Sequence, residues 1–143
     1  MLRDLTDKVA WVTGAGTGIG EGGAVALAQA GMHVVLSGRR EDKLQQVAER
    51  CEGRATIEVL DVADNAAVSA VAERIVERFG RIDVLLASAG INVKERNWHN
   101  VSVEDWDSVI RIDLDGAFYC CKAVLPTMKA QREGLIINIS SWA

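Results

Sequence analysis

Glycine residues cluster between positions 13 and 20, where the sequence reads TGAGTGIG. The cluster follows an apolar run typical of a strand and precedes a run of small residues typical of a helix. Glycines at such a turn let the backbone approach a pyrophosphate, which the N–H groups at the start of the helix then bind. No Gly-Lys-Ser/Thr sequence follows, which argues against a nucleoside triphosphatase. The pattern predicts a dinucleotide site, the alternative being a glycine-rich turn that binds nothing.

Two adjacent arginines follow the second apolar run, in the sequence SGRR at residues 37–40. A site that prefers NAD usually carries an acidic residue about 20 positions beyond the glycines, where it binds the ribose hydroxyls. Gly38 offers no carboxylate there, and the guanidinium groups of Arg39 and Arg40 can bind a 2′-phosphate through paired hydrogen bonds. The sequence therefore favours NADP over NAD. The alternative is that both arginines belong to an ordinary solvated surface.

Histidine and aspartate residues elsewhere do not form a recognisable catalytic set. His33 precedes an apolar run and His99 lies in an irregular segment, and neither has a serine or cysteine nucleophile at a motif spacing. Asp113 and Asp115 are two positions apart on an expected helix, so their side chains point in different directions. A hydrolase triad and a glycosidase carboxylate pair are therefore not expected.

Apolar runs of strand length alternate with longer segments of helical periodicity along the chain. Strands that are apolar on both faces need helices on both sides, which predicts an α/β fold with a doubly wound parallel sheet. Ligands of such sheets bind beyond the carboxyl ends of the strands, which here are residues 13–20, 37–40, 61–62, 87–91 and 140–143. The expected strands are residues 8–14, 33–38, 55–61, 81–90 and 135–140, and the expected helices are residues 22–31, 41–51, 65–80 and about 103–129.

Several residues predict where the helices begin and end. Ser102 and Asp105 resemble a capping box that starts the last helix. Pro126 predicts a kink or break near the end of that helix, and Gly31 and Gly80 predict the ends of two earlier ones. The least regular piece of the chain is residues 91–100.

Length and composition narrow the range of partners. A chain of 143 residues is one domain in size, and a net charge of −4 without a basic block argues against nucleic acid or an anionic membrane as a partner. Charged residues interrupt the N-terminus where a signal peptide would be apolar, so we expect a cytoplasmic protein. Cys51, Cys120 and Cys121 lack the spacing of a zinc site, which predicts reduced, buried thiols and no bound metal.

Taken in order, these motifs resemble the N-terminal part of a short-chain dehydrogenase/reductase, and the resemblance covers essentially all 143 residues. The family pattern TGxxxGxG matches residues 13–20, and an Asp-Val pair follows the third strand. The family's Asn-Asn-Ala-Gly motif is matched only in its last two positions, because residues 87–90 read ASAG. The resemblance implies a Rossmann-like sheet with strand order 3-2-1-4-5. It implies a cofactor site formed by Thr13, Gly14, Gly16, Thr17, Gly18, Ile19, Gly20, Arg39, Arg40, Asp61, Val62, Ser88, Ala89 and Gly90.

The chemistry implied by the resemblance is hydride transfer between NADP(H) and a small alcohol or ketone. Ser141 aligns with the family's catalytic serine, the alternative being that it forms a plain strand-end pair with Ser140. The family's helical asparagine corresponds to Asp113, a second catalytic candidate whose carboxylate could instead be structural. The family's tyrosine and lysine follow the serine and do not occur within residues 1–143. Tyr119 lies before the serine strand and three residues from Lys122, a spacing that does not fit the catalytic pair.

Two functions stay open at this stage. The first is an oxidoreductase whose incomplete subunit, residues 1–143, is a dinucleotide-binding Rossmann domain; the second is a non-catalytic nucleotide-binding or protein-interaction module. We expect the first, because strand 135–140 would form a sheet edge without its next parallel neighbour. An exposed apolar edge promotes self-association, so the isolated segment should aggregate or dissolve poorly. The resemblance also implies homodimers or homotetramers formed through helices, including residues 103–129.

Overall fold

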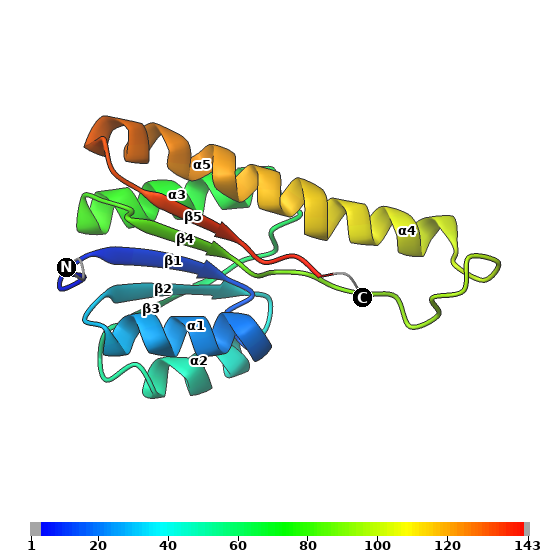
Figure 1. Cartoon of the computed structure of the whole chain (residues 1–143), viewed down its shortest axis with the longest axis horizontal. Coiled ribbons are helices and arrows are strands. Elements are labelled where there is room, and N and C mark those ends of the chain that lie inside the picture. The colour runs from blue at the N-terminus through cyan, green and yellow to red at the C-terminus, as the bar shows by residue number, and fades with distance from the viewer. Residues whose placement is uncertain (1–3, 142–143) are drawn as a thin grey trace.

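The computed structural model describes residues 4–141, which form a five-stranded parallel sheet between two layers of helices (Figure 1). The strand order is β3-β2-β1-β4-β5, as predicted. The strands are β1 (Val9–Thr13), β2 (His33–Gly38), β3 (Ala55–Val59), β4 (Val84–Ala87) and β5 (Leu135–Asn138). The helices are α1 (Gly18–Gln29), α2 (Glu41–Glu49), α3 (Asn65–Phe79), α4 (Val103–Val109), the π-helix η1 (Ile110–Asp115) and α5 (Gly116–Gln131).

Each face of the sheet packs against its own helix layer, because successive strand residues point to opposite faces. In β1, Val9 and Trp11 join the core beneath α3 and α5, whereas Ala10 and Val12 join the core beneath α1 and α2. Both cores are mainly apolar, with the buried Ser37 hydroxyl accepting a hydrogen bond from the Trp11 indole at 2.9 Å, and Figure 1 shows the two helix layers above and below the strands. The continuous apolar runs in the sequence are therefore buried on both sides, as expected for a parallel sheet.

The helix ends follow local signals, with two exceptions. Ser102 caps α4 by accepting a hydrogen bond from the Asp105 N–H at 3.1 Å, and Gly80 ends α3 with a φ of 73°. Helix α1 begins at Gly18, four residues before the predicted start, since the last glycines of the loop form its first turn. Pro126 does not break the helix, because α5 continues through this residue to Gln131, and the alternative of a kink stays a prediction.

A buried carboxylate joins β1 and β4 where these two inner strands begin, at the end of the sheet opposite the pocket side. Asp83 is only 4% exposed and accepts a hydrogen bond from the Val9 N–H at 2.8 Å and two from the Arg81 guanidinium at 2.7 and 2.6 Å. Burial alone would raise the pKa of the Asp83 carboxyl, but the bonds from Arg81 and Val9 outweigh it and lower the pKa below its ordinary value. Asp83 is therefore a buried, ionised carboxylate that links the start of β1 to the residue preceding β4.

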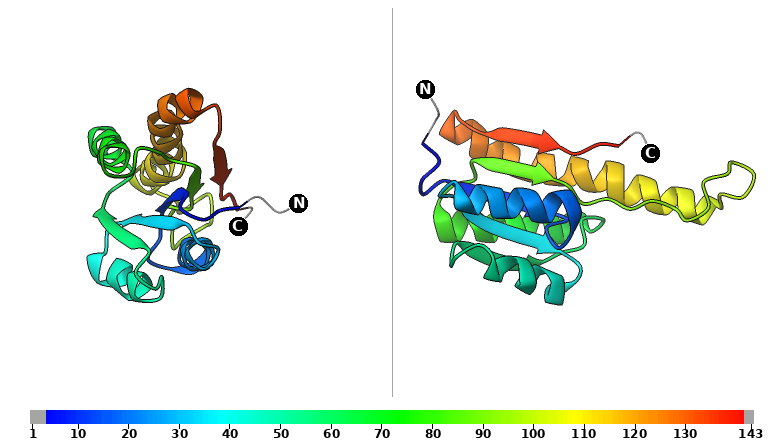
Figure 2. Two further views of the ribbon diagram at one scale, coloured as in Figure 1. Left: turned by 90° about the vertical axis from the view of Figure 1, so that its left-hand side faces the viewer. Right: turned by 60° about the horizontal axis from the view of Figure 1, so that its bottom comes forward.

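The segment between β4 and α5 projects beyond the sheet, and we call residues 92–112 the arm. Figures 1 and 2 show this segment extending past the carboxyl ends of the strands. No residue of α4 or η1 is buried. At the tip of the arm the rings of Trp98 and Trp106 lie 5.9 Å apart, and Trp98 is 80% exposed. None of the helices within residues 4–141 combines the length and hydropathy that crossing a bilayer requires.

Candidate functional site

A pocket of about 300 Å³ lies beyond the carboxyl ends of the strands. Its walls come from the loops after β1, β2, β3 and β4, with further contributions from α1, α2, η1 and the residue following β5. This is the position at which open parallel sheets bind their ligands. The lining residues are Gly14, Gly16, Thr17, Ile19, Gly38, Arg39, Arg40, Leu44, Leu60, Asp61, Val62, Ser88, Ala89, Gly90, Ile91, Ile112 and Ile139.

The glycine-rich loop is held close to its neighbours by backbone contacts. Gly14 has a φ of +64°, and a side chain there would come within 2.7 Å of the Ala89 backbone. The Ala15 N–H donates to the Ser37 carbonyl oxygen at 3.0 Å, which joins the loop to the end of β2. Thr17 precedes α1 without capping it through its side chain. The N–H groups of the first helical turn therefore have no acceptor from the Thr17 side chain, which leaves them available to an anion.

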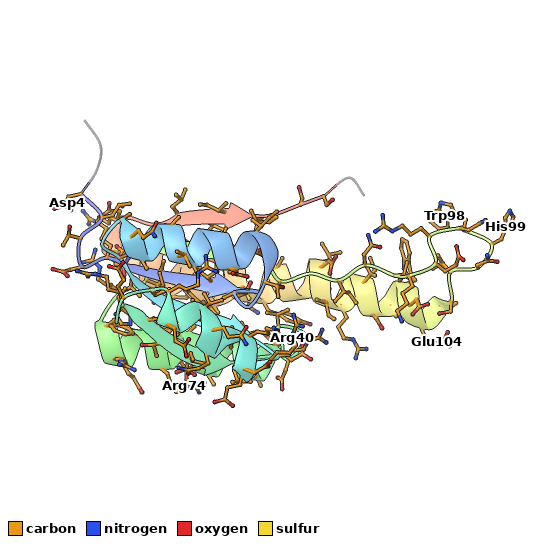
Figure 3. The ribbon with its side chains drawn as sticks, turned by 90° about the horizontal axis from the view of Figure 1, so that it is seen from below. Asp4, Arg40, Arg74, Trp98, His99 and Glu104 are labelled. Atoms are coloured by element: carbon orange, nitrogen blue, oxygen red, sulfur yellow. The ribbon has the colours of Figure 1, made fainter. Side chains whose placement is uncertain are left out.

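The two arginines after β2 are exposed at the rim of the pocket, and Figure 3 shows Arg40 at the end of the body from which the arm projects, with Trp98 at the tip of the arm. Neither the Arg39 nor the Arg40 side chain makes a hydrogen bond or an ion pair with another residue between positions 4 and 141. Arg74, by contrast, pairs with Glu58 at 2.7 Å. The rim therefore offers two unpaired guanidinium groups, which suit an anionic ligand group.

The wall after β3 is formed by Asp61 and Val62. The Asp61 carboxylate accepts a hydrogen bond from the Ala63 N–H at 3.0 Å, which fixes its orientation. Val62 is buried against the start of α5, where a side chain at Gly116 would come within 2.6 Å of the Val62 Cγ2 atom. The absence of a side chain at Gly116 thus lets α5 approach this wall.

The wall after β4 is supported from behind by two polar contacts. The Ala89 N–H donates to the Thr13 hydroxyl at 3.3 Å, and the Ile91 N–H donates to the Asp113 carboxylate at 2.9 Å. Thr13 is buried and Asp113 is exposed, and neither lines the pocket. Both therefore act on the pocket through backbone atoms of its wall.

The structure brings most of the residues expected to bind a cofactor into this one pocket. Thr13, Gly18 and Gly20 do not line it; Gly20 is buried, with its missing Cβ directed at the Gly14 carbonyl oxygen. Ser141 is exposed beyond β5 and is likewise absent from the lining, and residues 142 and 143 lie outside the described residues. Two lining residues, Gly38 and Ile91, fall within the predicted ligand-binding ranges but were not among the predicted cofactor-binding residues, and the lining residues outside both predictions are Leu44, Leu60, Ile112 and Ile139.

Other reactive side chains lie away from this pocket. Tyr119 and Lys122 line a separate groove between α3 and α5. Burial raises the pKa of the Cys120 thiol to about 12, so this thiol is protonated at neutral pH and is a poor nucleophile. Within the described part of the chain, no group of three or more histidine, cysteine, aspartate or glutamate side chains is arranged to hold a metal ion.

Sequence comparison places these features in a known family. The family described as short chain dehydrogenase matches residues 8–143. An uncharacterised oxidoreductase of Staphylococcus saprophyticus is 42% identical over 144 residues, which cover 98% of this chain and 61% of the relative. An uncharacterised oxidoreductase of Staphylococcus aureus is 41% identical over 138 residues, which cover 96% of this chain and 59% of the relative. The chain thus spans about three fifths of the length of these curated relatives.

Solved structures agree with this placement. A metagenomic short-chain oxidoreductase in complex with NADP has a TM-score of 0.92 and 34% sequence identity, with 99% of this chain and 65% of that chain covered. The serine dehydrogenase from Escherichia coli has a TM-score of 0.86 and 34% identity, with 93% of this chain and 62% of that chain covered. The strand order, the glycine-rich loop and the match over residues 8–143 agree, and the chain belongs to the short-chain dehydrogenase/reductase family.

Proposed function

We propose that residues 1–143 form the dinucleotide-binding domain of an NADP(H)-dependent oxidoreductase that acts on a small alcohol or ketone. The observation that carries this proposal is the pocket rim, where Arg39 and Arg40 are unpaired beside the glycine-rich loop. Strand β2 ends in Gly38, which has no carboxylate to bind ribose hydroxyls and repel a 2′-phosphate. The likeness to a short-chain oxidoreductase in complex with NADP adds support.

The residues present fit this cofactor. An added Cβ at Gly18 would meet nothing within 4 Å, so the start of α1 is open to a pyrophosphate. Glu21, the acidic residue in the first turn of α1, forms an ion pair with Arg50, which offsets a charge that would otherwise oppose phosphate. In this proposal Arg39 and Arg40 bind the 2′-phosphate, and Asp61 and Val62 lie along the adenine. When bound, NADP(H) supplies or accepts a hydride.

The roles of Ser141 and of the substrate belong to the same proposal. In the complete enzyme the Ser141 hydroxyl would hold the substrate oxygen, and a tyrosine with its lysine, as the family resemblance implies, would move the proton. Residues 1–143 contain neither at the expected place, since Tyr119 and Lys122 lie in the groove between α3 and α5. This segment would therefore bind the cofactor, and hydride transfer would require the complete enzyme.

The same observation on Tyr119 and Lys122 favours a second candidate, a nucleotide-binding or protein-interaction module without catalysis. An oxidoreductase and a nucleotide-binding module both expect NADPH binding by this chain, so binding alone separates them only from a protein-interaction module. The experiment that separates these two is a screen of alcohols and carbonyl compounds with NADP⁺ or NADPH, followed at 340 nm for the longest natural polypeptide that contains these residues. Turnover of any substrate would support the oxidoreductase, and no turnover despite tight NADPH binding would support the module.

Substituting the pocket arginines should change cofactor preference. We expect R39A and R40A each to raise the Kd for NADPH about tenfold, because each removes a hydrogen bond between two charged groups. The Kd for NADH should change less than twofold, since NADH lacks the 2′-phosphate. The measurement is a fluorescence titration of both cofactors, with the exposed arm residue Arg96 replaced by alanine as a control for net charge. Equal weakening of NADPH and NADH binding would contradict the assignment.

We also propose that the protein is a homo-oligomer that associates through α4, η1 and α5. Large apolar side chains are exposed along this continuous helical segment at spacings of three, eight, four and seven residues: Val103, Trp106, Leu114, Phe118 and Leu125. These spacings are close to whole turns of a helix, which keeps the side chains near one side of the segment. An exposed apolar stripe of this extent is typical of an interface.

Charged substitutions in the stripe should reduce the oligomer to smaller species. We expect L114E and F118E, which lie 61% and 58% exposed, to shift the protein toward monomer at micromolar concentration, since a buried unpaired charge is strongly unfavourable. R111E, on the same helical segment but outside the stripe, should leave the association unchanged. Sedimentation velocity measures the outcome. A wild-type protein that is monomeric in this assay would contradict the proposal.

A cytoplasmic location completes the proposal. Cys51, Cys120 and Cys121 are all free thiols, and two of them are buried. Free buried cysteines are usual in proteins of a reducing compartment, where disulfides are rare. Burial also raises the pKa of the Cys51 thiol, which makes it less reactive toward oxidants.

A further inference from the structure

The two ends of the arm join the body of the protein at neighbouring points. It leaves after Ile91, four residues beyond β4, and it returns at Asp113 in the middle of η1. The Ile91 N–H donates a hydrogen bond to the Asp113 Oδ1 atom at 2.9 Å, although the two residues are 22 positions apart in the chain. This bond closes the neck of the arm.

The neck is also part of the pocket wall. Ile91, which donates the bond, and Ile112, which precedes the acceptor Asp113, both line the pocket. Asp113 itself does not. The Asp113 carboxylate packs beside Gly90, since a Cβ at Gly90 would lie 3.5 Å from Oδ1 and 3.6 Å from Oδ2. One carboxylate therefore contacts two consecutive residues of the wall that follows β4.

Packing fixes this neck less firmly than it fixes the wall after β3. Ile112 is only partly buried against the core, neither α4 nor η1 has a buried residue, and the arm projects away from the sheet (Figure 2). In the wall after β3, by contrast, Val62 is buried against the start of α5. A polar contact at an otherwise loosely packed junction has more influence on its position than the same contact in a core.

We propose that Asp113 is a positioning residue that closes the neck of the arm and so holds Gly90 and Ile91 in place as a wall of the cofactor pocket. The inference rests on the proposed function, because the ligand whose binding it affects is NADP(H). Asp113 does not itself contact the pocket. It acts through the Ile91 backbone, and the acceptor oxygen is the property that matters. An asparagine, which occupies this position in the family pattern, retains such an oxygen, whereas leucine does not.

The test compares three variants at this position. D113L keeps the size of the side chain and removes the acceptor, D113N keeps the acceptor without the charge, and D113S is too short to reach the Ile91 N–H. Asp107→Leu, an exposed substitution on α4, is the matched control for adding leucine to the arm. Two quantities are measured at a temperature where every variant is folded: hydrogen–deuterium exchange of the Ile91 amide without ligand, and the Kd for NADPH.

We expect D113L to exchange the Ile91 amide about tenfold faster and to bind NADPH about three- to tenfold more weakly, as the loss of one hydrogen bond predicts. D113N should be close to wild type in both, and D107L should change neither. Should D113L fail to fold, D113S must show the same two changes.

Two results would overturn the inference in different ways. Unchanged Ile91 exchange in D113L and D113S would show that the carboxylate does not close the neck. Faster exchange with unaltered NADPH affinity, or a D113N as weak as D113L, would show that the acceptor oxygen does not position the pocket wall. A wild-type protein that does not bind NADPH would overturn the proposed function itself, while the exchange measurement would still decide whether Asp113 closes the neck.

Discussion

Replacing Gly20 by alanine should weaken NADPH binding by about 10- to 100-fold and lower the stability of the fold by about 1–3 kcal/mol, the range usual for overpacking. A Cβ at position 20 would come within 2.3 Å of the Gly14 carbonyl oxygen and 2.8 Å of its carbon. These are backbone atoms of the glycine-rich loop, so no side chain can move aside to make room. Gly14 cannot retreat either, because the Ala89 backbone lies directly behind it.

The same helix supplies the control for this substitution. Gly22 is exposed two residues further along α1, and an added Cβ there would meet nothing within 4 Å. Alanine at position 22 should therefore stabilise the protein by about 0.5–1 kcal/mol through its better helix propensity, without a change in cofactor affinity. Urea denaturation and NADPH titration of G20A and G22A measure both effects. A G20A variant that binds NADPH like the wild type would contradict the close packing between α1 and the loop.

Replacing Asp83 by alanine should have the largest effect on stability, about 3 kcal/mol, at the low end of the usual cost of breaking a buried ion pair. The substitution leaves the Val9 N–H without its acceptor, and the Arg81 guanidinium loses two hydrogen bonds. The low end applies because Arg81 is 40% exposed and can be rehydrated. Urea denaturation measures the loss. D107A, an exposed substitution on α4, should change stability by less than about 0.5 kcal/mol.

The pH dependence of stability gives a second measurement on the same group. The pKa of Asp83 is lowered in the folded protein, so its contribution is fully present above the unfolded pKa of about 3.9. The contribution is lost as the pH falls through the lower, folded value, because protonation removes the charge that binds Arg81. The stability of D83N should therefore fall less steeply with acid than that of the wild type. Parallel acid dependence in the two proteins would show that the pair is not charged.

Much of the fold could be predicted because its signals are local. Strand β1 is apolar in its first four positions, which indicates burial on both faces, and Ser102 and Gly80 lie where a helix must start and end. Asp83 was not predicted to join β1 and β4, because a single aspartate within an apolar run has no sequence signal that names its partners. The π-helix between α4 and α5 was also missed, since hydrophobic periodicity does not distinguish one inserted residue from normal variation in spacing.

Some residues of the candidate site could likewise be predicted from the sequence, and others could not. Residues in the strand-to-helix turns, such as Gly16 and Arg39, line the pocket where the motif spacing puts them. Leu44 reaches the pocket from the first turn of α2 and Ile112 from the distant η1, and both had the apolar character expected of core positions, so only the three-dimensional packing identifies them as lining residues. Ser141 is exposed just beyond β5 and does not line the pocket, so its catalytic role stays a prediction from the family resemblance.

The π-helical turn at residues 110–115 sets the rotation of α4 about the helix axis relative to α5. A π-helical turn holds one more residue than an α-helical turn, so the segment fits an extra residue without rotating the arm relative to α5. If the same six residues became α-helical without a deletion, the preceding part of the chain would rotate by about 100°, the angle that one α-helical residue contributes. Trp106 and Val103 would then face a different direction from Phe118 and Leu125. The π-helical form of this short segment therefore decides which way the arm presents its apolar side.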